Sequence, residues 1–203
     1  MATVGRWWIA PTLVFVGWLL SSCGGGGGGA PGGTPSAGQT PAMISDGAGM
    51  LLDAVSGGAT DSSRTVTGTD PFEVDLVVSR ASSPYQGYQY QVQWDPKVLA
   101  YDDQRDLKPA GLELCAAGAK GDDSFFSGCA RPSDSTDFTG PVNTLTFHCI
   151  ADGTSTVHLV KLAEDEDFGS SVLGFGGVII ETTLTDALVT CQRMASAPTL
   201  PPS

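Results

Sequence analysis

The stretch of sequence that decides the fold is residues 88–99, YQYQVQWDPKVL. From position 88 to 94, tyrosine, valine and tryptophan occupy every second position, and glutamines fill the positions between them. A period of two places the two sets on opposite faces of a β-strand, so we expect a buried aromatic face and a polar outward face. Asp95-Pro96 then ends the strand, because proline lacks the N–H that a ladder needs, and Leu99 returns to the core.

The same period of two recurs through residues 44–194 and predicts an all-β domain. Turn dipeptides such as Asp152-Gly153 separate the alternating segments. With residues 88–94, the expected strands lie at 50–55, 72–78, 98–102, 124–130, 144–149, 155–162, 178–183 and 187–191. About nine strands in one domain of this size indicate an antiparallel β-sandwich, either immunoglobulin-like or a jelly-roll.

The first 43 residues predict where the protein works. Residues 7–20 are an apolar run of about 14 residues, shorter than the ~20 that a spanning helix needs. Leu20-Ser21-Ser22-Cys23 follows directly and resembles a bacterial lipobox, which implies cleavage before Cys23 and a lipid on its sulfur. We therefore expect a signal peptide over 1–22, lipidated Cys23 with a Gly/Pro-rich tether over 23–43, and an extracytoplasmic protein lipid-anchored to the cell envelope. The alternatives are a plain secretory signal and an uncleaved anchor, which Pro11 disfavours.

The sandwich is expected to span residues 44–194, followed by a proline-rich tail over 195–203. Four cysteines lie in the domain, Cys115, Cys129, Cys149 and Cys191, and an even number in an exported protein indicates two disulfides. Three pairings are possible. We favour Cys115 with Cys129, which closes a short loop, and Cys149 with Cys191, which would join distant strands.

Charge and motif content exclude several function classes. The net charge is -12 and basic residues are scattered singly, so nucleic acid is not an expected partner. There is no GxSxG, HExxH, P-loop or Rossmann motif around His148, His158 or elsewhere, so we expect neither an enzyme nor a cofactor. No metal site is expected. The weak candidates form an acidic run that is either solvated or holds calcium: Glu164, Asp165, Glu166 and Asp167.

Three segments resemble the cohesin family. Residues 88–99 are similar to the cohesin strand that ends in an aromatic-Asp-Pro-x-x-Leu turn, and 140–159 are similar to the cohesin segment of a glycine-led strand, a turn and a second strand. A weaker match is Phe168 followed by residues 176–179. The resemblance covers about residues 50–193. It implies a cohesin-like sandwich, related in fold to carbohydrate-binding modules, that binds dockerin-type protein modules in surface assembly or polysaccharide breakdown.

In cohesins the outward face of the first matching strand belongs to the sheet that docks a partner. The resemblance therefore predicts a partner-binding face that comprises Gln89, Gln91 and Gln93, extended on the second matching strand by Thr144, Thr146 and His148. A merely solvated polar face is the alternative. We expect Tyr88, Tyr90 and Trp94 in the core rather than stacked on sugars. The sequence thus favours a binding module for a protein partner, with a carbohydrate-binding module and a purely structural surface lipoprotein as alternatives.

Overall fold

A computed structural model describes residues 44–119, 121–131, 133–162 and 169–192. The leader, Cys23, the tether, the acidic run 164–167 and the tail lie outside the described residues. The described part contains two short 3-10 turns, η1 (Pro109–Gly111) and η2 (Phe175–Gly177), and these strands: β1 (Ile44–Asp53), β2 (Ser63–Thr67), β3 (Phe72–Ala81), β4 (Gly87–Gln93), β5 (Leu99–Asp106), β6 (Leu114–Ala119), β7 (Ser124–Ala130), β8 (Gly140–Cys149), β9 (Gly153–Leu159), β10 (Ser171–Leu173), β11 (Ile179–Thr185) and β12 (Ala187–Gln192). Within these ranges no helix is long and apolar enough to cross a membrane.

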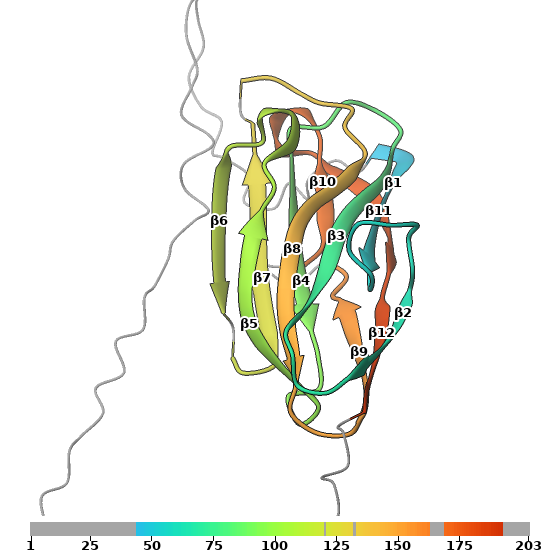
Figure 1. Ribbon diagram of the computed structural model, residues 1–203. Coiled ribbons are helices and arrows are strands. Elements are labelled where there is room, and N and C mark those ends of the chain that lie inside the picture. The colour runs from blue at the N-terminus through green and yellow to red at the C-terminus, as the bar shows by residue number, and fades with distance from the viewer. Residues whose placement is uncertain (1–43, 120, 132, 163–168, 193–203) are drawn as a thin grey trace, which may run out of the picture. The chain divides into compact units, whose positions relative to one another are not determined.

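The strands form two packed layers (Figure 1). One layer has the order β11-β1-β3-β8-β5, and the other has the order β2-β12-β9-β4-β7-β6. The short strand β10 pairs with β4 and with β11 and so connects the layers along one side. An all-β sandwich is therefore confirmed, in which the inner faces of both layers make the core.

The sandwich is mixed rather than purely antiparallel, which corrects the sequence prediction. Strand β1 pairs in parallel with β11, and β2 pairs in parallel with β12. Both parallel pairs join the first part of the domain to its last part. Strand periodicity gives the side-chain faces but carries no information on the direction of a distant partner, so the sequence could not supply this feature.

The structure also has twelve strands instead of nine. Each of the nine expected strands is present, with shifted ends, and β2, β6 and β10 are additional. Strand β10 has three residues and β2 has one buried apolar residue, Val66. Strand β6 reads Leu-Cys-Ala-Ala-Gly-Ala and lacks any alternation of large apolar and polar residues. These segments are strands because their neighbours pair with them, and their own patterns do not show it.

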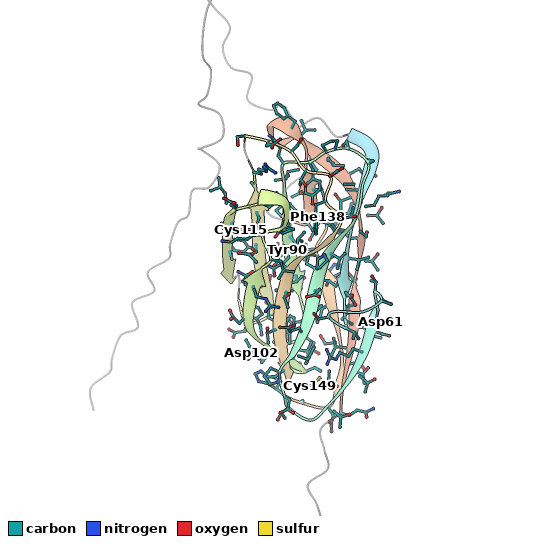
Figure 2. All side chains as sticks on the ribbon, turned by 45° about the horizontal axis from the view of Figure 1, so that its top comes forward. Asp61, Tyr90, Asp102, Cys115, Phe138 and Cys149 are labelled. Atoms are coloured by element: carbon teal, nitrogen blue, oxygen red, sulfur yellow. A yellow bond between two sulfur atoms is a disulfide. The ribbon has the colours of Figure 1, made fainter. Side chains whose placement is uncertain are left out.

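Both favoured disulfides are present. Cys115 on β6 and Cys129 on β7 stand directly opposite each other, with Cα atoms 4.1 Å apart. Cys149 on β8 and Cys191 on β12 have Cα atoms 5.7 Å apart and covalently join the two layers. Figure 2 shows Cys115 toward one end of the sandwich and Cys149 toward the other. The two bridges therefore tie different parts of the domain.

Candidate protein-binding face

Strand β4 separates its aromatic and polar side chains as the sequence predicts. Tyr88, Tyr90, Val92 and Trp94 are all at most 7% exposed. Tyr90 lies inside the sandwich (Figure 2), and the Trp94 ring meets Phe147 of the other layer edge-on at 5.3 Å between centroids. These rings are core, as expected, and they offer no flat exposed surface on which a sugar could stack.

Burial of the tyrosines also keeps this interior uncharged. Desolvation raises the pKa of Tyr85 and of Tyr101 to about 12, with nearby carboxylates adding to the effect. The pKa values of Tyr88 and Tyr90 are raised above their usual range for the same reason. The chain has four tyrosines, and all four hydroxyls resist ionisation beyond the ordinary value of about 10.

The polar side of β4 is only partly available to a partner. Gln93 is exposed and Gln89 is half-buried, with its Nε2 donating to the Gly169 carbonyl at 3.2 Å. Gln91 is 3% exposed, and its Nε2 donates to Ser124 Oγ at 3.1 Å. The prediction that Gln91 contacts a partner is therefore wrong, because its side chain is occupied in holding β4 to the start of β7.

The second predicted set does not extend the same face. Thr144, Thr146 and His148 lie on β8, and β8 belongs to the opposite layer from β4. Because the inner faces of β4 and β8 meet in the core, their outward faces point in opposite directions. The structure thus divides the six predicted residues between two surfaces, and the prediction of one combined face is wrong.

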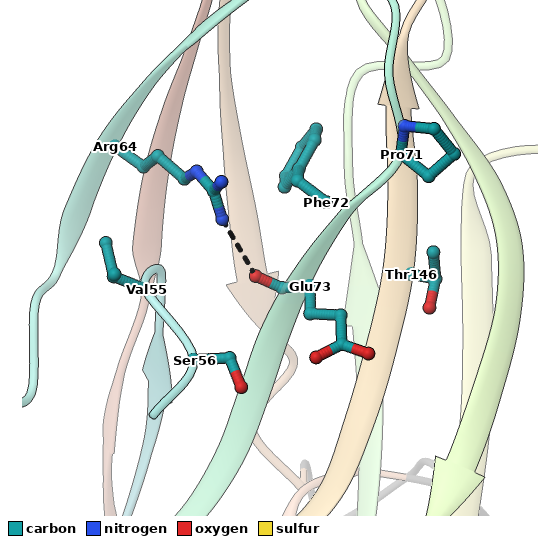
Figure 3. A pocket seen from close by; sticks show the side chains of 7 residues that line it. All are labelled: Val55, Ser56, Arg64, Pro71, Phe72, Glu73 and Thr146. Atoms are coloured by element: carbon teal, nitrogen blue, oxygen red, sulfur yellow. Dashed lines mark hydrogen bonds between the residues drawn. The ribbon is translucent and has the colours of Figure 1, made fainter. Parts of the chain in front are cut away.

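The residues of the second set contact other parts of the domain. Thr144 is buried and its Oγ1 donates to Asp75 Oδ1 at 2.7 Å, so it cannot reach a partner. His148 Nδ1 lies 2.8 Å from Asp102 Oδ1. Thr146 lines a hollow of about 430 Å³ beside Arg64 and Phe72 (Figure 3).

Arg64, which lines the hollow in Figure 3, stabilises the edge of the domain. The guanidinium of Arg64 lies 5.2 Å from the centroid of the Phe72 ring and donates to the carbonyls of Ala54 and Glu73. Its donors therefore serve the backbone of neighbouring segments. This arrangement fastens β2 to β3.

The outward sides of β4, β7 and β6 all lack charged residues. None of these three strands contains Asp, Glu, Lys or Arg, although the chain has 22 acidic and 10 basic residues. The strand register places one outward set side by side, which we call the uncharged face: Gln89, Gln93, Ala116, Gly118, Phe126, Gly128 and the 63% exposed Leu114. In the other layer, β3 and β5 carry Glu73, Arg80, Asp102, Asp103, Arg105 and Asp106.

The uncharged face also contains two glycines at positions that leave little room for a side chain. The Phe126 ring lies over Gly118, where a Cβ atom would come within 2.8 Å of Phe126 Cζ. A Cβ at Gly128 would come within 2.6 Å of the Tyr88 carbonyl oxygen on β4. Sequence reasoning missed Leu114 and Phe126. The lack of charge in residues 87–93, 114–119 and 124–130 can be read from the sequence, but their pairing as neighbouring strands cannot.

The described residues include one group of three that has the residue types of a metal site, Asp106 with Cys115 and Cys129. The sulfurs of Cys115 and Cys129 form a disulfide with each other, so this group has no thiolate that could bind an ion. The predicted acidic run, Glu164 to Asp167, lies outside the described residues.

No protein-family model matches the chain, and no curated protein matches it. Its fold is similar to several solved cohesins. The sixth cohesin of scaffoldin B from Acetivibrio cellulolyticus, solved with a dockerin, has a TM-score of 0.56 at 11% identity, covering 72% of this chain and 99% of that one. A type I cohesin from Clostridium thermocellum, also in complex with a dockerin, gives 0.55 at 11% identity, over 78% and 99% of the two chains. A non-cellulosomal cohesin from the archaeon Archaeoglobus fulgidus gives 0.53 at 10% identity, over 71% and 90%.

Proposed function

We propose that this protein is a non-catalytic binding module that docks another protein on its uncharged face. The observation that carries the proposal is the absence of charged residues from β4, β6 and β7 in a strongly acidic chain. The centres of protein interfaces are depleted of charge, because a charge buried there loses its hydration. The exposed Leu114 suits the same purpose.

A dockerin-type module is the partner that we propose. Two of the structures with this fold are cohesins in complex with dockerins. The strand with the cohesin-like Asp-Pro turn, β4, contributes Gln89 and Gln93 to the uncharged face. A role in surface assembly or polysaccharide breakdown belongs to this proposal, whereas direct carbohydrate binding is less well supported, since Tyr88, Tyr90 and Trp94 are core.

Charge on the uncharged face is expected to weaken docking. In the variant Gln89→Arg with Gln93→Arg, each guanidinium would have to lose water under the partner, so affinity for a responsive dockerin should fall at least about tenfold, or about 1.4 kcal/mol. The domain should stay folded, because Gln93 is exposed and the half-buried Gln89 loses one hydrogen bond, to the Gly169 carbonyl, worth about 1 kcal/mol. Surface plasmon resonance against a panel of purified dockerin modules measures the effect.

Thr146→Arg is the control, since it places a positive charge on the opposite layer and should leave dockerin affinity unchanged. Equal loss of binding in the control, or full binding by the double variant, would contradict the uncharged face as the docking surface.

We further propose that Cys23 is lipidated and that the tether, residues 24–43, carries the domain outside the membrane. The support is the lipobox-like sequence before Cys23 and the two disulfides, which form in oxidising compartments. Cys23→Ala should remove all incorporation of radiolabelled palmitate and release the protein from the membrane fraction. Unchanged membrane partitioning of that variant would rule out the lipid anchor.

A further inference from the structure

Four strands lie at the ends of the layers in the described part of the chain, β11, β5, β2 and β6, and they differ in how their outer edges are protected. Strand β11 pairs with β10 at Ile179 and Ile180. Strand β5 carries four charged residues and a register shift between Tyr101 and Asp103. Strand β2 is five residues long and carries Arg64. Strand β6 has no charge, no proline and no register shift against β7. Charges, prolines and irregularities are the usual protection of an edge, so β6 is left open to another strand.

The backbone of β6 presents hydrogen-bonding groups to that edge. The Cα atoms of Cys115 and Cys129 are 4.1 Å apart, the close spacing of a pair that exchanges no backbone hydrogen bonds. The N–H and C=O groups of Cys115, and of Ala117 two residues on, therefore point away from β7. Ala117 is exposed. Its side chain and those of its neighbours are too small to hinder an approaching backbone.

A hollow of about 370 Å³ lies at the turn that follows β6. Gly121 and Asp122 of this turn line it together with Trp94, Leu99 and Tyr101. A strand that pairs with β6 would direct alternate side chains toward this open side of the sandwich. A lysine or arginine suits the hollow, because its apolar stem can pack on Tyr101 while its charged head reaches Asp122.

The charges at the two ends of β6 decide which strand can bind. Antiparallel pairing of two copies about Ala117 would place Glu113 of each beside Gly121 of the other, next to Asp122 and Asp123. Even with Lys120 counted, residues 120–123 carry one net negative charge, so both ends of such a dimer would be repulsive. A strand with basic residues at its two ends would be attracted to Glu113 at one end of β6 and to Asp122 and Asp123 at the other.

We propose that β6 accepts an extended peptide from another protein as an additional antiparallel strand, and that this peptide has a small uncharged centre and lysine or arginine at its ends. Backbone hydrogen bonds to Cys115 and Ala117 supply the attraction, and the hollow beside Asp122 supplies the selectivity. This contact uses the edge of the layer, so it goes beyond the proposed docking on the uncharged face.

The test uses the full chain labelled with ¹⁵N and the peptide Lys-Lys-Val-Ala-Val-Ala-Val-Lys-Lys. Titration should shift the amide signals of β6 and of the 121–123 turn, and should slow hydrogen exchange of the Ala117 amide. The same peptide with glutamates in place of the lysines should bind at least about tenfold more weakly. N-methylation of alternate amides in the lysine peptide should abolish the shifts, because the peptide backbone then cannot complete the ladder.

Ala117→Pro is the decisive variant, because it removes a free-edge N–H and leaves the hydrogen bonds to β7 in place. It should melt near the wild-type temperature and lose the peptide. Asp122→Asn should reduce the difference in affinity between the lysine peptide and the glutamate peptide. Gln89→Arg with Gln93→Arg should keep peptide binding, which separates this proposal from docking on the uncharged face. Unchanged affinity in Ala117→Pro, equal binding of both peptides, or a dimer that Ala117→Pro dissociates would overturn the proposal.

Discussion

Replacing Trp94 by alanine is expected to lower the free energy of unfolding by about 3 to 5 kcal/mol, enough to unfold many domains of this size. The indole is 7% exposed and lies where the two layers meet at the Asp-Pro turn. Its ring stacks on Tyr101 with centroids 5.8 Å apart and meets the edge of Phe147 at 5.3 Å. Truncation would leave a cavity bounded by both layers, which cannot both move inward to fill it.

Urea unfolding followed by circular dichroism measures this loss. Gln93→Ala is the control, because the neighbouring residue is exposed and should change stability by no more than about 0.5 kcal/mol. Trp94→Phe should lose less stability than Trp94→Ala, since it keeps a ring and Nε1 has no hydrogen-bond partner among the described residues. If Trp94→Ala melts like the wild type but no longer sediments with polysaccharide, carbohydrate binding replaces protein docking as the function.

Removing the Cys149–Cys191 disulfide is expected to cost about 4 kcal/mol on the chain-entropy account. Its sequence separation is 42 residues, and it is the bridge between β8 of one layer and β12 of the other. The Cys115–Cys129 bridge has a separation of 14 residues and links neighbouring strands, so its removal should cost about 3 kcal/mol. Both variants replace the two cysteines together with alanine, which avoids a leftover thiol.

The difference between the two bridges is the informative measurement. Thermal and urea unfolding of both double variants, each with its remaining bridge confirmed by peptide mapping, give the two free energies. A greater loss on removing Cys115–Cys129 would show that native packing around the shorter bridge matters more than the entropy of the closed loop.

The strands with strong alternation could be predicted from the sequence. In β4, the period of two placed Tyr88, Tyr90 and Trp94 in the core, and Pro96 marked the end of the strand. The number of cysteines predicted two disulfides, and the pairing that we favoured among the three possible ones is present in the structure. The alternation and the turn are local features of one segment, so a single sequence reveals them.

The burial of polar residues could not be predicted in the same way. Gln91 and Thr144 stand at outward positions of alternating strands, yet both are buried. Their partners, Ser124 and Asp75, are 33 and 69 residues away along the chain. A polar side chain buried on the outward side is recognisable only when the strands that cover and satisfy it are in place.

The parallel pairing of β1 with β11 and of β2 with β12 has a consequence for biogenesis. The first strands of the domain obtain these parallel partners only from β11 and β12, the last two strands, so a nascent chain cannot close its sandwich while its C-terminal end is still being made. If the protein is exported as we propose, a secretion channel that threads the polypeptide from its N-terminus would receive a chain without a finished tertiary structure. Completion of the sandwich would coincide with release on the far side, where the cysteines also meet an oxidising milieu.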